Sequence, residues 1–364
     1  MSAPLAPDDV VSTHAAAASN ERAPLVVLEP LRAFLTQCGL LTDDRGELHV
    51  EPLGDGHSNV TLLLRSGARE LVLRRPPRGP LPPSAHDVLR EARLLRALGP
   101  TAARVPRVLA VGDDETLIGV PFYVMERVHG DVVTTAVPLA LDTPEQRRRI
   151  GEELVDALVE VHAVDWRASG LDRLSNRPEG YLHRQLRRFL GLWEHNRTRE
   201  IAAVERVGAW LREHLPPSPP PTIVHGDYRL GNVMLAAQAP ARIDAIFDWE
   251  MATIGDPLAD VGYLCALWVQ RDDPPLGMFE LSSVTREAGF PTRDELVARY
   301  ERRSGRSMTN IRWYRTLALW KAVVFMEGNY RRALAGSTDD PWLHGFGEGV
   351  VALAERAEQG TREG

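Results

Sequence analysis

Lysine is almost absent from this chain of 364 residues. Lys321 is the only one, so 42 of the 43 basic residues (43 − 1) are arginine. Any role that proteins usually give to a lysine must be filled by arginine here or go unfilled. Arginine is a planar, permanently charged fork and not a compact ammonium, so this exchange is not chemically neutral.

Cysteine and long apolar runs are scarce as well. With only Cys38 and Cys265, the sequence offers no disulfide framework and no thiolate metal site. No apolar run approaches the roughly 18 residues that a membrane helix needs. Residues 1–24 are rich in alanine and proline and lack the basic start and apolar stretch of a signal peptide, so we expect a flexible tail there. These features predict a cytoplasmic protein.

An excess of positive charge is also missing. The net charge is −7 and the isoelectric point is about 5.9. No global basic field would therefore attract nucleic acid or an anionic membrane, and we expect neither as a partner. Hydrophobic residues make up 44% of the chain and charged residues 26%, which is typical of a globular protein.

Hydrophobic periodicity makes the first third of the chain β-rich. A helix is predicted over residues 28–40. A second helix follows the proline-rich run PPRGPLPPS, with Ser84 as its N-cap. Short strands are predicted at 48–53, 60–64, 70–74, 107–111 and 120–127.

The rest of the chain is mainly helical, apart from an island of short strands and loops at 222–256. Helices are predicted at 143–164, 180–197, 202–214, 257–270, 293–304, 310–334 and 339–358. This order predicts an α+β fold of two lobes. The small β-rich N-lobe would span residues 25–126 and the larger helical C-lobe residues 127–364, with a cleft near 125–130.

The island at 222–256 contains the residues that point to chemistry. It holds His225-Gly226-Asp227, with Asn232 five positions after the aspartate, and an apolar strand that ends in Asp248-Trp249-Glu250. Phosphoryl transfer needs a carboxylate beside the attacking hydroxyl, ligands for magnesium and positive charge at the phosphates. Asp248 and Asn232 offer the oxygen ligands that Mg²⁺ prefers, which leaves Asp227 as the catalytic base. The plain alternative is that these aspartates cap turns and helices.

The run HGDYRLGN resembles the catalytic loop of the aminoglycoside phosphotransferase-like branch of the protein-kinase fold, and IFDWE resembles its metal-binding segment. Protein kinases space the corresponding loop as D-x-K-x-x-N, and Asp227, Arg229 and Asn232 have the same spacing. The resemblance implies that Arg229 contacts the γ-phosphate as a second catalytic residue, with a structural salt bridge as the alternative. It also implies a small-molecule kinase that uses Mg²⁺ and ATP or GTP.

The resemblance extends to the N-terminal third. Gly54, Gly56 and Ser58 lie between two predicted strands, where this fold has the hairpin that covers the phosphates. The strand LVLRR places Arg74 where kinases usually have a lysine, and Glu91 on the following helix is its expected partner. The alternative is that both side chains face solvent.

The run Met125-Glu126-Arg127-Val128 ends a strand. By resemblance it is the hinge, in which the backbone of Met125, Glu126 and Val128 binds the adenine. We expect the side chains of Glu126 and Arg127 to face solvent or each other.

Four other polar residues are assigned structural roles. We expect Asp256 and Asp260 to brace the catalytic loop and cap the helix after Pro257. We expect His162, on an apolar helix, to lie in the core and His225 to shape the loop by hydrogen bonding.

From about residue 50 to 335 the chain resembles, in particular, the kinase-like domains fused to or encoded near acyl-CoA dehydrogenases. The runs GHSNVT, VLRRPP, HGDYRLGNVML and DWEMATIGDPLADVGYL carry this resemblance. It implies phosphorylation of a hydroxyl on an acyl chain, as in a hydroxyacyl-CoA. The helices after the metal segment carry more basic than acidic residues, which suits an anionic acceptor better than a polyamine.

Three alternatives stay open. The first is an antibiotic phosphotransferase acting on an aminoglycoside or macrolide, and the second is a choline, homoserine or sugar kinase. The third, motivated by Arg74, is a nucleotide-binding pseudokinase. Substrate loops vary while the phosphate machinery stays constant, so the sequence does not separate them.

Overall fold

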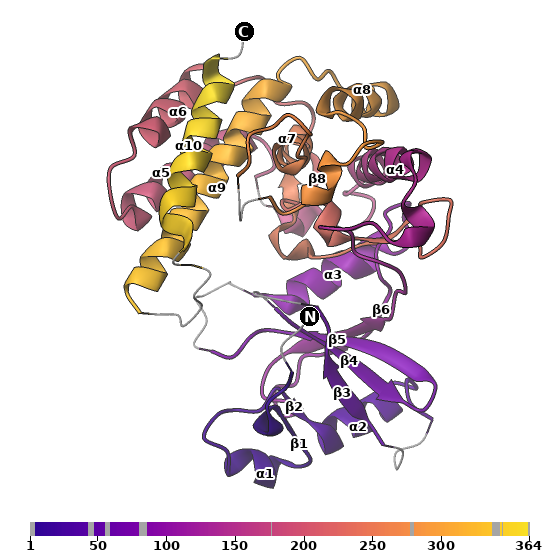
Figure 1. Ribbon diagram of the computed structural model, residues 1–364. Coiled ribbons are helices and arrows are strands. Elements are labelled where there is room, and N and C mark those ends of the chain that lie inside the picture. Colours follow the sequence, from indigo (N-terminus) through magenta and orange to yellow (C-terminus); the bar gives the residue numbers. More distant parts are fainter. Residues whose placement is uncertain are drawn as a thin grey trace. The chain divides into compact units, whose positions relative to one another are not determined.

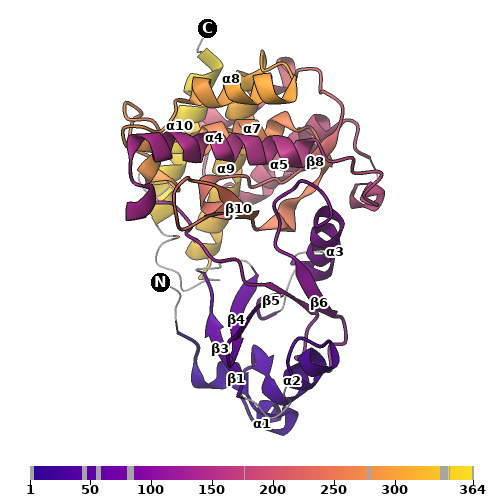
Figure 2. The same ribbon diagram turned by 90° about the vertical axis from the view of Figure 1, so that its right-hand side faces the viewer.

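The computed structural model describes residues 4–42, 47–54, 59–79, 86–175, 177–276, 280–336, 343 and 345–362 (Figures 1 and 2). The chain divides into two compact units. The first comprises residues 1–101 and 105–128, and the second comprises residues 102–104 and 129–364.

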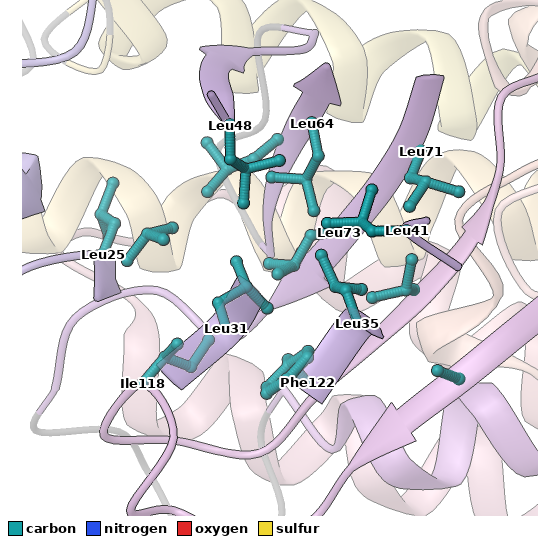
Figure 3. Close-up of a cluster of buried hydrophobic side chains, with 14 residues drawn as sticks. Leu25, Leu31, Leu35, Leu41, Leu48, Leu64, Leu71, Leu73, Ile118 and Phe122 are labelled. Atoms are coloured by element: carbon teal, nitrogen blue, oxygen red, sulfur yellow. The ribbon is translucent and has the colours of Figure 1, made fainter. Parts of the chain in front are cut away.

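A five-stranded antiparallel sheet forms the centre of the first unit, in the order β3-β4-β5-β7-β6. Its strands are β3 (His49–Pro52), β4 (Val60–Ser66), β5 (Arg69–Arg75), β6 (Val108–Gly112) and β7 (Phe122–Glu126). Helix α2 (Leu28–Gln37) packs on one face, because Leu31 and Leu35 are one turn apart and both fully buried. In Figure 3 these two side chains point toward Leu64 and Leu73 of the sheet.

Helix α3 (Val88–Leu98) begins later than the sequence indicates. Its N-cap is Asp87, whose carboxylate accepts a hydrogen bond of 2.8 Å from the amide of Arg90. The expected N-cap, Ser84, lies outside the described residues. The predicted N-cap was therefore wrong, because a carboxylate closer to the apolar stripe fills that role.

Short elements occupy residues 7–27: η1 (Pro7–Asp9), β1 (Val10–Val11), α1 (His14–Ala18) and β2 (Val26–Val27). This differs from the flexible tail that the composition predicts. Strands β1 and β2 pair in parallel, and the buried Arg75 of β5 donates to the carbonyl oxygens of Pro24 and Leu25. Arg78 donates to the carboxylate of the buried Asp9 near the start of the segment. Contacts with distant residues, which composition does not reveal, give this segment its structure.

Helices dominate the second unit. They are α4 (Pro144–His162), α5 (Tyr181–Asn196), α6 (Ala202–Glu213), α7 (Leu258–Leu267), α8 (Arg293–Ser304), α9 (Ile311–Leu334) and α10 (Phe346–Arg362). Helix α9 runs beside α10 in both views (Figures 1 and 2) and also contacts α5, α6 and α7. Its Trp313 and Trp320 are buried, as their spacing predicts, and both indole N–H groups donate to carbonyls of α6.

Two short antiparallel ladders fall within the predicted island. Strand β8 (Thr222–Val224) pairs with β11 (Thr253–Gly255), and β9 (Val233–Leu235) pairs with β10 (Ile243–Ile246). The predicted α+β class, with a β-rich first part and a larger helical part, is confirmed. Within the described ranges, no helix is both long and apolar enough to span a membrane.

Candidate active site

One carboxylate of helix α7 holds the loop that follows β8 by hydrogen bonds to its backbone. Asp260 is 1% exposed, and its two oxygens accept the backbone N–H groups of His225 at 2.7 Å and Gly226 at 2.8 Å. Both loop amides, that of the buried His225 and that of the half-buried Gly226, are thereby satisfied by one side chain. The predicted bracing role of Asp260 is confirmed.

A buried chain of hydrogen bonds continues away from Asp260. His162 Nε2 lies 3.2 Å from the Asp260 carboxylate, and His162 Nδ1 lies 2.7 Å from the hydroxyl of Tyr300. Burial lowers the pKa of His162. Burial opposes ionisation of Asp260, but hydrogen bonding and charge from His162, together with the loop amides, lower its pKa. The core position expected for His162 is confirmed.

Gly226 is required by the shape of this loop. Its φ is +88°, and a Cβ atom there would lie 3.0 Å from both the Cβ and the carbonyl oxygen of Met251. An L-residue would meet strain and a close contact at once. The turn at Gly226 brings the next residue, Asp227, out of the β8 ladder.

Asn232 holds Asp227 in place. The Asn232 side-chain amide donates to the Asp227 carbonyl oxygen and to Asp227 Oδ2, each at 2.8 Å. The Asp227 backbone N–H donates to His225 Nδ1 at 3.2 Å. Because the amide nitrogen of Asn232 is directed at Asp227, its amide oxygen is left for another partner.

The loop is also tied to the strand that precedes Asp248. His225 Nε2 donates to the Phe247 carbonyl at 2.8 Å, and the Phe247 N–H donates to the Asn232 carbonyl at 2.8 Å. His225 thus bonds to both halves of the motif, as its predicted loop-shaping role requires. Asp227, Asn232 and the residue before Asp248 belong to one continuous set of short hydrogen bonds.

Asp248 adopts the left-handed conformation, with φ 64° and ψ 57°. Among L-residues, aspartate and asparagine tolerate this region best, and such residues gather at functional sites. The indole of Trp249, which follows it, donates to the Ile246 carbonyl at 2.9 Å and closes the turn.

The donor set of Asp248 and Asn232 fits magnesium. Both provide oxygen atoms, and Mg²⁺ usually takes one or two protein ligands and completes its shell with phosphate oxygens and water. A cage of three or more His, Cys, Asp or Glu side chains is not found in the part of the chain that the structure describes.

Arg229 lies beside Asp227. Its Nε is 3.6 Å from Asp227 Oδ1, and both side chains are about one-fifth exposed, 22% and 20%. The guanidinium passes over Gly231, where a Cβ atom would lie 2.2 Å from Arg229 Nη1. This geometry includes the salt bridge that the structural alternative expects, and contact of Arg229 with a phosphate stays a prediction.

Asp256 has the structural role that its position indicates. Its carboxylate accepts the Leu258 N–H at 2.9 Å at the start of α7 and the Tyr314 hydroxyl at 2.8 Å. Burial raises the pKa of this carboxyl despite the two donors.

In the first unit, the predicted pair of Arg74 and Glu91 is present. Arg74 Nε donates to Glu91 Oε2 at 2.9 Å, and its Nη1 donates to the Thr61 hydroxyl at 3.2 Å. The side chains are 13% and 2% exposed. The alternative of two solvent-facing side chains is therefore wrong. Arg75, the next residue, is occupied by carbonyl groups of its own unit.

The residues predicted to cover the phosphates are only partly described. Gly54 has a φ of +80°, which glycine adopts without strain. Gly56 and Ser58 lie outside the described residues. The role of this turn stays a prediction.

The expected hinge segment uses some of its polar groups internally. The Glu126 N–H donates to the Arg107 carbonyl, and the Glu126 carboxylate accepts the Arg107 N–H, both at 3.0 Å. The partner of Glu126 is thus Arg107 and not Arg127, because the strand pairing of β6 and β7 brings it closer. Met125 lies in the sheet between β5 and β6. A base-contacting role would therefore fall to the Glu126 carbonyl and the backbone of Val128, which follows the end of β7.

A model of the phosphotransferase enzyme family matches residues 49–314, which is most of the chain. The chain belongs to this family. The predicted resemblance to aminoglycoside phosphotransferase-like proteins is thereby confirmed, and the chain is a phosphotransferase of the small-molecule kinase type.

Three proteins show where this phosphotransferase stands. Acyl-CoA dehydrogenase family member 10 of Mus musculus is 34% identical over 90% of this chain and 30% of its own length. A candidate aminoglycoside phosphotransferase of Ralstonia eutropha is 29% identical over 92% of this chain and 98% of its own, with a TM-score of 0.77. The GDP complex of aminoglycoside 2'-phosphotransferase-IIIa shares the fold at 16% identity, with a TM-score of 0.59 over 91% and 98% of the two chains. The phosphotransferase spans less than half the length of the curated relatives that it matches.

Sequence reasoning missed one side chain of this phosphotransferase that lies at the catalytic loop. Burial raises the pKa of the Tyr263 phenol, and the nearby carboxylate of Asp227 raises it further. Tyr263 follows Asp260 by three residues on α7, which places both on the same side of the helix. That spacing from a predicted bracing residue was the signal that could have identified it.

Proposed function

We propose that this phosphotransferase moves the γ-phosphate of ATP or GTP to a hydroxyl group of a small molecule, with Asp227 as the general base. The observation that carries the proposal is the fixed orientation of Asp227, whose carboxylate and carbonyl both accept from Asn232. A base needs such orientation to meet the proton that it removes. Nucleotides in complexes with members of this fold, such as the GDP complex above, support a nucleotide donor.

In the proposed transfer, one phosphorus–oxygen bond forms and another breaks. Asp227 takes the proton of the acceptor hydroxyl as that oxygen bonds to the γ-phosphorus, and the bond from this phosphorus to the β-phosphate oxygen breaks. A nucleoside diphosphate leaves. Magnesium would be held by Asp248 and the amide oxygen of Asn232, and it would supply positive charge that offsets the negative charge of the phosphates.

Two arginines are assigned to the phosphates. Arg74 remains charged at any physiological pH, and its ion pair with Glu91 fixes the direction of its fork. Arg229, next to Asp227, is the second candidate. The turn of Gly54, Gly56 and Ser58, the Glu126 carbonyl and the Val128 backbone are proposed to bind the rest of the nucleotide.

As the phosphate acceptor we propose a molecule with a hydroxyl group on an acyl chain, such as a hydroxyacyl-CoA. The support is the relationship to proteins named as acyl-CoA dehydrogenase family members over 90% of this chain. Likeness to the Ralstonia eutropha protein favours an aminoglycoside as the competing acceptor. A cytoplasmic location stays a prediction from composition.

A nucleotide-consumption screen tests this function. Hydroxyacyl-CoAs, aminoglycosides, macrolides and small alcohols are each supplied with MgATP and with MgGTP, and nucleoside diphosphate is measured. We expect turnover with hydroxyacyl-CoAs that is lost in Asp227→Asn. Turnover only with aminoglycosides or macrolides would move the acceptor to the competing class. Failure of any nucleotide to bind in the presence of magnesium would overturn the proposal, and binding without turnover of any acceptor would favour a pseudokinase.

A further inference from the structure

A small recess lies next to the catalytic loop, entirely within the second unit. Its volume is about 20 Å³, room for one water-sized group. The wall includes Gly226 of the loop, Asp260 and Tyr263 of α7, Tyr181 at the start of α5, and Lys321 of α9. Gly226 precedes the proposed base, so a group in this recess lies close to the reacting centre.

Lys321 is the only lysine of the chain. Its side chain is half-buried and lines this recess. Among the described residues, no carboxylate lies within ion-pairing distance of its Nζ. Its contact on the other side is the ring of Phe189, with Nζ 4.8 Å from the ring centroid. A cation in such a place is incompletely compensated by its own protein.

Asp260, the carboxylate that lines the recess, already accepts other hydrogen bonds. Asp260 accepts from His225 and Gly226 and faces His162, so its oxygens are occupied by the loop that they brace. Burial, together with the charge of Arg188 on α5, lowers the pKa of Lys321 to about 8, and Asp260 only partly opposes this. Within the described ranges, the ammonium therefore has no carboxylate at ion-pairing distance to stabilise it.

The other polar groups of the recess are phenols. Tyr314, which also lines the recess, donates its hydroxyl to Asp256. Tyr181 packs against Gly255, where a Cβ atom would lie 2.4 Å from its ring. Tyr263 faces Asp227, as described above. Phenols and an ammonium can donate hydrogen bonds to one oxygen atom, and the volume admits about one such atom.

We infer that Lys321, with Tyr181, binds an acyl oxygen of the phosphate acceptor while the acceptor hydroxyl lies at Asp227. The oxygen belongs either to a carboxylate or to a thioester carbonyl. Both groups place an oxygen with full or partial negative charge within a few bonds of an alkyl chain. Lys321 thereby selects acceptors with an acyl group. It disfavours polyamines, because their ammonium groups would be repelled by the Lys321 ammonium. This inference rests on the proposed function and assigns its specificity to one residue.

The single lysine makes a direct test possible. Reductive methylation with formaldehyde and cyanoborohydride at pH 8 can modify Lys321 and the terminal amine, and peptide mass spectrometry separates the two rates. The probes are hydroxy acids of four to eight carbons with the hydroxyl at positions 3 to 5, their CoA thioesters, and diols of matching length. All are used with and without MgADP.

We expect acids or thioesters to slow modification of Lys321 by about tenfold or more at saturation, since a bound oxygen holds the amine protonated and covered. The diols should have no effect, and the rate at the terminal amine should not change. Protection by acids alone or by thioesters alone identifies the source of the oxygen. Modification of Lys321 at one rate with every probe would overturn the inference. This readout needs no turnover, so it stays interpretable if the proposed function fails.

Kinetics of Lys321→Met provide the second test. Methionine keeps most of the side-chain volume and removes the charge. We expect the KM for acyl acceptors to rise about 10- to 100-fold, with the KM for nucleotide unchanged, because one charge-assisted hydrogen bond is lost. Arg332→Met is the matched control: it removes one positive charge from the same helix at an exposed position, and its kinetics should match the parent. Equal KM values for acyl acceptors in the parent and in Lys321→Met would contradict the inference and leave the proposed function intact.

Discussion

The catalytic-loop region of the second unit and the β5–α3 region of the first unit hold their charged side chains differently. Asp227 belongs to a set of short hydrogen bonds shared among His225, Asn232 and Phe247. Arg74 is held by charge and hydrogen bonds to side chains on other elements, with its Nε donating to the Glu91 carboxylate and its Nη1 to the Thr61 hydroxyl. We therefore expect substitutions in the loop to change chemistry more than folding, and substitutions in the β5–α3 region to affect both.

The largest expected effect is that of Asp227→Asn on turnover. Asparagine keeps the shape and can still accept from Asn232, but it cannot take a proton at neutral pH. Loss of a general base should lower kcat by about 10² to 10⁴. The melting temperature should stay close to that of the parent, as measured by calorimetry. A variant that turns over within a few-fold of the parent would show that another group removes the proton.

Glu91→Gln should reduce stability strongly, because it removes the negative charge from one partner of an ion pair that is nearly closed to solvent. Removing one partner of a buried ion pair costs about 3–5 kcal/mol of unfolding free energy. Glu51→Gln is the control, since its ion pair with Arg65 is 48% and 44% exposed and should contribute at most about 1 kcal/mol. Denaturant unfolding of the three proteins measures the difference. Equal losses in both variants would show that the Arg74–Glu91 pair is no more important than a surface pair.

Arg74→Ala should lose most activity at fixed nucleotide concentration, on the order of 10- to 100-fold, because a charged contact to phosphate is removed. Arg74→Lys should keep part of it, since a point charge can still bind phosphate but without the fork. Steady-state kinetics with the acceptor found in the screen measure both. If Arg74→Ala runs at the parent rate, the phosphates are held elsewhere. Arg229 is then the better candidate, because Arg75 is occupied by backbone carbonyls.

Local patterns predicted the second unit better than the first. The spacing of Asp227, Arg229 and Asn232 identified a loop whose contacts are short-range in sequence, so the motif carries most of its geometry. Asp260 was predicted as a brace from its place in the run GDPLAD, although it lies 35 and 34 residues after the amides that it accepts. The positions of the helices of the second unit agree with the prediction within a few residues at most ends.

What the sequence did not reveal depends on distant contacts. The N-terminal segment is ordered by Arg75 and Arg78, more than 45 residues away in the chain, and its alanine- and proline-rich composition gives no sign of them. The pairing of Glu126 with Arg107 follows from strand order and not from neighbourhood in sequence. The recess at Lys321 combines residues of four segments, and no local motif indicates it.

The smallest expected effect is a pH dependence centred on Lys321. Its pKa is lowered to about 8 in the folded protein from an ordinary value of 10.5. Between these values the unfolded chain binds more protons, so the contribution of Lys321 to stability is unfavourable below pH 8 and this penalty disappears as pH rises to 10.5. Lys321→Met should therefore melt higher than the parent at pH 7, by on the order of 2–4 °C. The difference should shrink by pH 10, and a difference that does not vary with pH would contradict the lowered pKa.

Asp248 is assigned to the metal and Asp227 to proton removal, and calorimetric titration of nucleotide tests this assignment most directly. MgATP and MgGTP are titrated into the parent, Asp248→Asn and Asp227→Asn. We predict that Asp248→Asn weakens magnesium-dependent binding by at least about tenfold, because it removes a carboxylate from the metal. Asp227→Asn should bind nucleotide within a few-fold of the parent. Equal loss of binding in both variants would contradict the assignment of metal and base.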